Sequence, residues 1–350
     1  MSFSEVLNLH IQTGGDSALE LLSRPLANLS AILAGDPTTI FSPQATPAHT
    51  IFGLSLLVLA ITAIIFLVVG GLLLYALVRF RSRPGDSAED PRQIYGSNQI
   101  EVLWTVIPVL ILVVLFLATI RVISETETVR KPANALDVVV IGHQYWWEYR
   151  YPKLGIVTAN ELHIPVSDPH APLPTYLTMS SADVDHSFWV PKLAGKMDLI
   201  PNKVNVLWMD PHTPGLYLGQ CAQYCGMEHA MMLIRVYVDK PDKFAKWVAE
   251  QQKPAEDALA AAKGKEAFLH TACVNCHTVS GTEAKGKFGP DLTHLASRET
   301  IASGTAQNTP ENLRKWIEDP DQMKMGSQMP KMNLSSRDLD LITAYMASLR

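Results

Sequence analysis

The sequence is poor in charged residues, and this shortage narrows the class of protein. Asp, Glu, Lys and Arg make up 18% of the 350 residues, and apolar residues make up 47%. A disordered chain is excluded, because disorder needs low apolar content and high charge. With 29 basic and 34 acidic residues the net charge is −5, so the chain lacks the basic surface that nucleic-acid binding requires. The mean hydropathy of +0.09 excludes a polytopic transporter and fits a soluble body with a few membrane spans.

Other features are missing as well. The sequence shows no nucleophile–base pair or phosphate-binding loop, which argues against a hydrolase or a transferase. Residues 1–40 lack the basic start and the continuous apolar core of a standard signal peptide. Two stretches there, 6–11 and 19–33, have an amphipathic pattern, and we expect them to lie on the membrane surface. The chain has only 4 cysteines, in two close pairs that each stand near a histidine.

Two long runs carry no charge. Residues 51–78 and 102–120 contain no Asp, Glu, Lys or Arg, and a helix of about 20 residues crosses the hydrocarbon layer. We therefore expect membrane spans at about 51–78 and 101–121, the second kinked at Pro108. The loop between them carries Arg79, Arg81, Arg83 and Arg92. The positive-inside rule places this loop in the cytoplasm and both chain ends outside.

The pattern changes twice after the second span. Short runs rich in β-branched and aromatic residues, separated by Pro, Gly and Asp, predict a β-sandwich or barrel. These runs are 138–141, 144–151, 176–179, 204–209 and 233–238. Residues 240–265 are rich in charge and alanine and predict a helical linker broken at Pro254. From residue 263 onward the pattern is again helical, notably at 311–318 and 337–349.

One cysteine pair has the spacing of a haem attachment site. Cys273-Val-Asn-Cys276-His277 is a C-x-x-C-H motif. Two thiols one helical turn apart reach both vinyl groups of a haem, and the adjacent imidazole then points at the iron. The alternative is a disulfide or a redox-active pair, which shares the C-x-x-C spacing.

A second axial ligand is expected downstream, where a thioether would raise the potential. The candidates are Met323, Met325, Met329 and Met332, in a loop at 320–333 rich in Gly, Pro and Met. Met329 precedes Pro330 in a run similar to the axial-methionine loop of small cytochromes c, and FGPDL at 288–292 supports the same interpretation. We therefore expect Met329 to bind the iron. His294 is the competing candidate, although it lies close to the attachment site.

The other cysteine pair lies in a run of soft metal ligands. Residues 221–232 read CAQYCGMEHAMM and supply Cys221, Cys225, His229 and Met232, and a further imidazole stands at His186. Thiolates and a thioether beside imidazole select copper over hard cations. Two thiolates exceed the need of a mononuclear blue-copper centre, so the run allows a sulfur-bridged copper pair. A disulfide between the two cysteines is the alternative in an oxidising compartment.

These runs resemble subunit II of haem–copper cytochrome c oxidases over residues 50–240. The segments that carry the resemblance are IEVLWTVIPVLIL (100–112), GHQYWWEYRYP (142–152), DHSFWVPKLAGKMDLIPN (185–202) and the run at 221–232. Residues 263–350 resemble the cytochrome c domain fused to that subunit in caa-type oxidases, including GPDLTHLASR and NTPENLRKWIEDP.

The resemblance implies a multidomain membrane protein. Its parts would be a two-helix transmembrane hairpin, a cupredoxin-like Greek-key β-sandwich and an all-α class I cytochrome c domain. The expected boundaries are 1–48 for an N-terminal extracytoplasmic segment, 49–122 for the hairpin, 123–240 for the cupredoxin domain, 241–262 for the helical linker and 263–350 for the cytochrome c domain.

The resemblance also implies a dinuclear copper centre of the CuA type. Its ligands would be the bridging thiolates Cys221 and Cys225, the imidazoles His186 and His229 (one on each copper), and two weak ligands, the Met232 thioether and the backbone carbonyl of Gln223. Met231 is out of register and is assigned to packing. An interface magnesium ion (Mg) loses a ligand here, because many family members have glutamate where Gln223 stands.

Two further residues take a role from the resemblance. Tyr145 occupies the position of a tryptophan at which electrons are proposed to enter, whereas Trp146 and Trp147 are expected to pack in the sandwich or an interface. Glu101, at the cytoplasmic start of the second span, matches a carboxylate at the mouth of a proton-uptake channel. The alternative for Glu101 is a plain interfacial carboxylate stabilised by the helix dipole.

The implied function is electron input to a proton-translocating respiratory oxidase of the bacterial inner membrane, with both soluble domains on the periplasmic face. Electrons would pass from an external donor, such as a cytochrome c or a quinol:acceptor complex, through covalent haem c and CuA to the haem of subunit I, where oxygen is reduced to water. Subunit III and membrane lipid are further expected partners. The alternatives are a CuA-bearing nitric oxide reductase and a copper-free assembly subunit, and the complete ligand set argues against the second.

Overall fold

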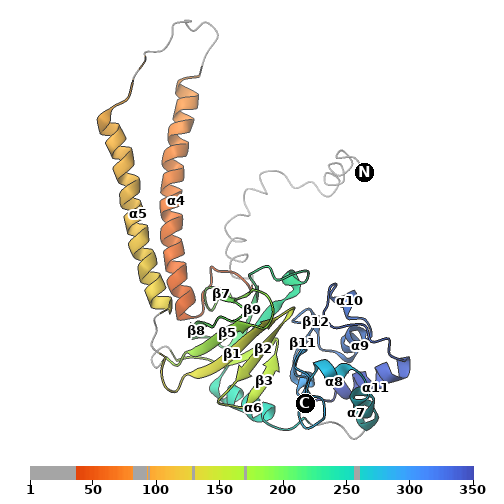
Figure 1. Ribbon diagram of the computed structural model, residues 1–350. Helices are drawn as coiled ribbons and strands as arrows, with labels where there is room; N and C mark the ends of the chain where they lie inside the picture. The colour runs from red at the N-terminus through yellow and green to blue at the C-terminus, as the bar shows by residue number, and fades with distance from the viewer. Residues whose placement is uncertain (1–36, 82–92, 94, 128–130, 169–171, 256–260) are drawn as a thin grey trace, which may run out of the picture.

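The structure, a computed structural model, describes residues 37–81, 93, 95–127, 131–168, 172–255 and 261–350. Two long helices stand as a hairpin on a β-sandwich, and a small helical domain lies beside the sandwich (Figure 1). The two amphipathic stretches expected at 6–11 and 19–33 lie outside the described residues, as does most of the loop between the spans.

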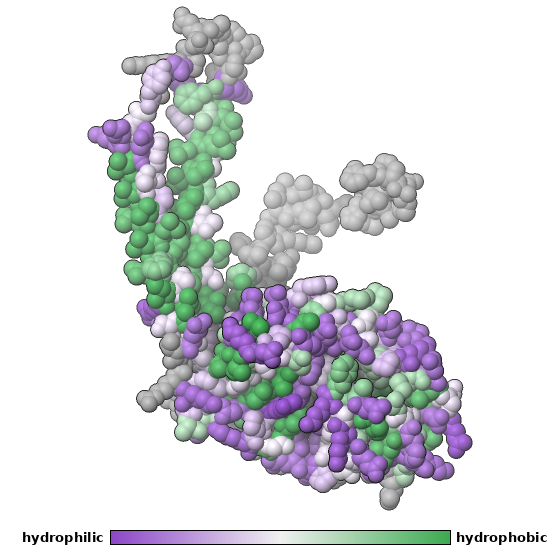
Figure 2. All heavy atoms as spheres, in the orientation of Figure 1, coloured by the Kyte–Doolittle hydropathy of each residue, from purple (hydrophilic) through white to green (hydrophobic). Residues whose placement is uncertain are grey.

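The hairpin consists of α4 (Thr46–Arg79) and α5 (Asn98–Glu127). Their most apolar windows have mean hydropathies of 3.0 and 2.9, and none of those residues is buried within the chain. The exposed side chains form a continuous apolar band (Figure 2), which only lipid or another apolar surface can cover. Each predicted span lies within one of these two apolar helices, with Pro108 inside α5. Each helix is longer than its uncharged run because polar residues extend it.

Hydrogen bonds from one edge of the sandwich hold the near ends of both helices. Asp210 is buried and accepts from the backbone N–H of Thr46 at 2.8 Å and from its hydroxyl at 2.6 Å, so it caps the start of α4. The indole of Trp208 donates to the carbonyl of Thr126, near the end of α5, at 2.6 Å. The opposite end of the hairpin, where α4 ends at Arg79, lies away from the sandwich (Figure 1). The ends of the two helices at Arg79 and Asn98 therefore lie at the end of the hairpin remote from the soluble domains, as the predicted topology requires.

Two mixed five-stranded sheets form the sandwich. The first contains β1 (Leu136–His143), β2 (Trp146–Tyr151), β3 (Ile156–Ala159), β5 (Thr175–Ser181) and β8 (Asn205–Met209), in the order β3-β2-β1-β5-β8. The second contains β4 (Glu161–Pro165), β6 (His186–Trp189), β7 (Met197–Leu199), β9 (Gly215–Cys221) and β10 (Leu233–Asp239), in the order β4-β10-β9-β6-β7. The pairs β1–β5 and β4–β10 are parallel and the other neighbours are antiparallel.

The inner faces of the two sheets share one apolar core. Trp147 from the first sheet meets Phe188 from the second edge-to-face, with ring centroids 5.6 Å apart. The predicted runs coincide with β1, β2, β5, β8 and β10. The sequence pattern misses β3, β4, β6, β7 and β9, because these strands are short or carry Gly, His, Glu or Gln that interrupt the apolar alternation.

The first part of the predicted linker is a helix that packs on the sandwich. Helix α6 (Pro241–Gln251) places Trp247 against the ring of His163, with centroids 4.5 Å apart and planes at 15°. Asp239, at the end of β10, joins the same contact, because its carboxylate pairs with His163 at 2.8 Å and with Lys243 at 2.8 Å. The chain therefore leaves the sandwich along a fixed direction.

The C-terminal domain is helical, as predicted, with one small addition. Its helices are α7 (Ala262–Leu269), α8 (Cys273–Cys276), α9 (Pro310–Glu318), α10 (Pro320–Met323) and α11 (Ser336–Met346). Phe268 on α7 packs against Tyr345 on α11, with ring centroids 5.8 Å apart, in a core separate from that of the sandwich. A two-stranded hairpin of β11 (Thr300–Ile301) and β12 (Ala306–Gln307) is an element that the all-α prediction misses. This hairpin faces the sandwich.

Candidate metal centre and haem pocket

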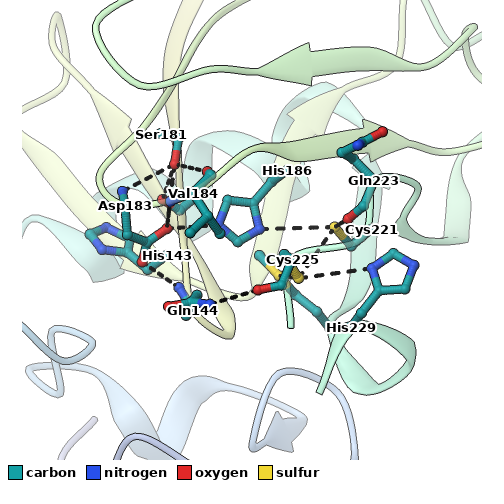
Figure 3. Close-up of polar contacts among 12 residues, drawn as sticks. His143, Gln144, Ser181, Asp183, Val184, His186, Cys221, Gln223, Cys225 and His229 are labelled. Atoms are coloured by element: carbon teal, nitrogen blue, oxygen red, sulfur yellow. Dashed lines mark hydrogen bonds and ion pairs between the residues drawn. The ribbon is translucent and has the colours of Figure 1, made fainter. Parts of the chain in front are cut away.

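The run 221–232 folds back beside β6 and brings the predicted copper ligands into a row (Figure 3). His186 Nδ1 lies 3.9 Å from Cys221 Sγ, the two Sγ atoms lie 3.9 Å apart, and Cys225 Sγ lies 3.8 Å from His229 Nδ1. A disulfide needs an S–S distance of about 2.05 Å, so both thiols are free. The two imidazoles lie next to different sulfurs, so the arrangement could offer one nitrogen to each of two metal ions.

Two weaker donors complete this group. Met232 is fully buried with Sδ 3.9 Å from Cys225 Sγ, and the carbonyl oxygen of Gln223 lies 3.2 Å from Cys221 Sγ. The preceding methionine, Met231, has no such contact among the described residues. Cys221, Cys225, His186 and Met232 are buried and His229 is partly exposed. A set of two thiols, two imidazoles and a thioether suits a soft metal such as copper.

Electrostatic contacts hold the first imidazole and favour ionisation of one thiol. Burial lowers the pKa of His186, but hydrogen bonds to Asp183 and Cys221 outweigh burial and leave the pKa raised. A hydrogen bond with Cys225, assisted by His186, lowers the pKa of Cys221 to about 3 despite its burial. The same sharing of one proton raises the pKa of Cys225. Cys221 can therefore bind a metal ion as a thiolate, and metal binding at Cys225 would displace the proton of its thiol.

The segment GHQYWW lies next to this row. The side-chain amide of Gln144 donates to the carbonyl of Cys225 at 2.6 Å (Figure 3). The hydroxyl of Tyr145 accepts from the backbone N–H of Met227 at 3.1 Å, and the side chain is only 8% exposed. Tyr145 is therefore not a surface residue in this chain.

A second site lies within the C-terminal domain, next to the sandwich. It is a cavity of about 280 Å³ whose wall includes Cys273, Cys276 and His277. Helix α8 spans the two cysteines, and both thiols are free. On the sandwich side the wall includes Gln144, Tyr145 and Trp146. The cavity thus bears the complete C-x-x-C-H motif and touches the residues that contact the copper run.

The FGPDL run explains how His277 is oriented. The ring N–H at Nδ1 of His277 donates to the carbonyl oxygen of Pro290 at 2.8 Å, which leaves Nε2 free to bind a metal. A Cβ on Gly289 would lie 2.6 Å from Cε1 of the same ring, so only glycine allows this placement. Burial lowers the pKa of His277, which keeps the ring neutral and able to act as a ligand.

The cavity narrows the choice of second axial ligand. Met329 and Met332 both line it, and Met325 is 71% exposed outside it. His294 is buried but does not belong to the cavity wall. Met329 therefore stays the predicted second ligand of the iron. Met332 is the alternative, because it also lines the cavity.

A buried cation also faces the cavity. Arg298 donates one guanidinium N–H to the carbonyl of Asp291 at 2.5 Å, and its Nε has no hydrogen-bond partner among the described residues. Burial lowers the pKa of Arg298 because it removes water from the charged guanidinium. An anion placed beside this cation would compensate the lost hydration. A haem carries propionates as well as an apolar ring. The wall also includes the apolar side chains of Phe268, Leu313 and Ile342, so it fits both parts of a haem.

Comparisons with known proteins agree with this organisation. Residues 38–122 match the family described as cytochrome c oxidase subunit II, transmembrane domain, residues 160–238 match its periplasmic domain, and residues 261–350 match cytochrome c. Cytochrome c oxidase subunit 2 of Alkalihalophilus pseudofirmus is 33% identical, over 93% of this chain and 96% of the relative. The chain belongs to the cytochrome c oxidase subunit II family.

Further matches to this family are of the same kind. Cytochrome c oxidase subunit 2 of Bacillus subtilis is 31% identical, over 79% of this chain and 82% of the relative. Among solved structures, the periplasmic domain of subunit II of cytochrome oxidase of Bradyrhizobium japonicum is 28% identical with a TM-score of 0.33, over 35% of this chain and 97% of that chain. This subunit II is a membrane protein with a cupredoxin-like domain and a fused cytochrome c domain, and these families imply copper, haem and a partner subunit I.

Glu101 lies in the first turn of α5, at the end of the hairpin remote from the sandwich. This position agrees with either interpretation of its carboxylate, and its assignment to proton uptake stays a prediction.

Sequence reasoning missed several residues that build the sites of this subunit II. Three residues contact a predicted metal-binding residue or line the haem cavity but match no metal or haem motif: Asp183, Gln144 and Arg298. Asp183 stands three residues before His186, and this carboxylate–imidazole spacing is a signal that could have found it. Lys324 and Glu228 form an ion pair between the two soluble domains, and such a long-range pair leaves no local pattern.

Proposed function

We propose that this subunit II accepts electrons from an external donor at a covalently attached haem c and passes them to a dinuclear CuA centre and then to the haem of subunit I. Oxygen is reduced to water in subunit I of this proton-translocating oxidase. The observation that supports this route is the shared wall between the two sites. Gln144 lines the haem cavity and donates to the carbonyl of Cys225 in the copper run.

The residues of the cavity would hold a haem in one orientation. Cys273 and Cys276 would attach the haem through thioether bonds, and His277 and Met329 would be the ligands of its iron. Arg298 would neutralise a propionate. The bound haem supplies a site that takes up and releases a single electron.

The copper run would hold two ions between its thiolates. Cys221 and Cys225 would supply the two thiolates and His186 and His229 the two imidazoles. The Met232 thioether and the carbonyl of Gln223 would be weaker ligands. Asp183 accepts from His186 Nε2 and so leaves Nδ1 facing Cys221, where it could act as a ligand. These side chains already lie close together in the structure, so binding of copper would need little rearrangement of the chain.

The remaining assignments follow from family membership. Tyr145 lies between the two sites rather than at an exposed docking patch, so we assign it to the internal route. Glu101 belongs to proton uptake from the cytoplasmic side. Subunits I and III are the membrane partners, and the soluble domains face the periplasm of a bacterial inner membrane. An interface magnesium ion is left without the glutamate that Gln223 replaces.

The test is a metal and haem analysis of the purified complex. We expect two coppers per chain, a delocalised mixed-valence electron paramagnetic resonance spectrum, and haem that stays with the chain through acid–organic extraction. Cys221→Ser should abolish the copper signal and leave the haem, whereas Cys273→Ser should loosen the haem and leave the copper. One copper with an ordinary four-line spectrum, or haem that extracts freely, would contradict the proposal. Turnover of nitric oxide instead of oxygen would favour the nitric oxide reductase alternative.

A further inference from the structure

A buried ion pair joins the two soluble domains. Lys324 Nζ, in the methionine-rich loop of the cytochrome c domain, lies 3.1 Å from Glu228 Oε2 in the copper run, and their side chains are 3% and 2% exposed. The same ammonium donates to the backbone carbonyl of Tyr145 at 2.9 Å. One lysine therefore contacts both the run that carries the copper ligands and the segment between the two sites.

The two loops also touch directly beside this pair. A Cβ on Gly326 would lie 3.1 Å from the Cβ of Met227, and the backbone of Gly326 has a positive φ of 94°. A larger residue at this position would be strained and would push the loops apart. The loop that contains Met329 is thus held against the run that contains Cys225.

A second polar contact lies at the β11 hairpin. The buried carboxylate of Glu161 on β4 accepts from the backbone N–H of Thr300 at 2.8 Å, from the hydroxyl of Thr300 at 2.7 Å and from the backbone N–H of Glu299 at 3.1 Å. The hydroxyl of Tyr237 donates to the Glu299 carboxylate at 2.7 Å. Two separated contacts fix the rotation of one domain on the other, which a single contact would leave open.

We propose that Lys324 and Glu228 form a latch that holds the cytochrome c domain in one docked orientation on the copper run. A flexible tether alone would give an effective concentration in the millimolar range and many orientations. Burying two charges costs free energy that their attraction only partly returns, so such a pair is a device for orientation more than for affinity. Lys324 is thus a positioning residue, because it acts through the placement of the two sites.

The consequence for electron transfer rests on the proposed function, whereas the docking itself does not. Electron tunnelling falls exponentially with distance, so a domain released from its docked orientation transfers electrons more slowly to the copper run. Docking can be measured separately, because the amides of Glu299 and Thr300 are protected from exchange only while the domain is docked on Glu161.

The experiment is amide hydrogen exchange of the purified full-length complex, compared with internal electron transfer after rapid reduction of the haem. Lys324→Met leaves Glu228 buried without its partner, and we expect exchange at 299–300 to accelerate about 30-fold or more. Lys331→Met is the matched control, because Lys331 lies in the same loop and pairs with Asp319 at 2.7 Å on the surface of its own domain. Exchange in α11 reports whether the domain itself stays folded.

Faster exchange at 299–300 with unchanged α11 and a silent control supports the latch. Unchanged exchange at 299–300 in Lys324→Met overturns it. If α11 also loses protection, Glu228→Gln decides, because it removes the charge from the sandwich side and leaves the cytochrome c domain unchanged. Faster exchange at 299–300 in this variant supports the latch, and unchanged exchange overturns it. Undocking without any slowing of internal electron transfer would leave the latch standing and refute the proposed electron route.

Discussion

Replacing Asp183 by asparagine tests how the protein positions a copper ligand. Asp183 Oδ1 lies 2.9 Å from His186 Nε2, which leaves Nδ1 of that ring facing Cys221. The backbone N–H groups of Gln144 and Val184 also donate to this carboxylate, each at 2.7 Å. Asparagine has one acceptor oxygen in place of two, so its amide nitrogen must face at least one of these three donors.

The size of the effect follows from the role and exposure of the carboxylate. Losing a partner that orients a metal-binding histidine typically weakens metal affinity by about 10- to 100-fold, or about 1.4 to 2.7 kcal/mol. The Asp183 side chain is 32% exposed, so solvent screens its charge and we expect a loss near the lower limit, about tenfold. The neutral amide also makes the imidazole a weaker donor, which raises the reduction potential of the copper centre.

The assay is a competition titration of copper between the purified protein and a chelator, combined with redox titration of the copper spectrum. Asp185→Asn is the matched control, because Asp185 lies two residues from Asp183, is exposed, and has no side-chain hydrogen bond or ion pair with His186 among the described residues. A copper affinity within twofold of that of the unchanged protein, with an unchanged potential, would refute the reasoning about Asp183.

Two further predictions concern the haem and acid stability. Met329→Ala should lower the haem midpoint potential by a shift on the order of 0.1 V, because axial ligands set potentials over about 0.8 V. Redox titration checks this, with the exposed Met325→Ala as the control. A shift in Met332→Ala instead would assign the role of ligand to Met332. Burial would raise the pKa of Asp239, but hydrogen bonds to His163 and Lys243 outweigh it and hold the pKa below its usual range. This contribution to stability is present above the ordinary pKa of about 4 and is lost as pH falls through the lower folded value. Thermal melting should therefore show a lower melting temperature for Asp239→Asn at neutral pH, and nearly equal melting temperatures for the two proteins below pH 4. A constant difference in melting temperature over this range would contradict the assignment.

The local parts of this architecture can be predicted from the sequence, and the contacts between them cannot. Uncharged runs fix the two spans because lipid tolerates no unpaired charge, and the C-x-x-C-H motif fixes its site because the ligands are adjacent. The copper row is predictable only in part, since His186 joins it from a different strand and required a family resemblance. The ion pair of Lys324 with Glu228 joins residues almost a hundred positions apart, and no periodicity or spacing relates them.

The anchoring of the hairpin has a mechanical consequence. Trp208 and Asp210, two residues apart, hold the near ends of α5 and α4. The two helices and the sandwich therefore move together as one body. The uncharged part of α4 is 28 residues long (51–78), or about 42 Å at 1.5 Å per residue, which exceeds the roughly 30 Å hydrocarbon layer and is accommodated by tilt. A change in bilayer thickness that alters this tilt would therefore rotate the soluble domains relative to the membrane. The orientation of the copper run toward a partner subunit in the membrane would then depend on lipid thickness.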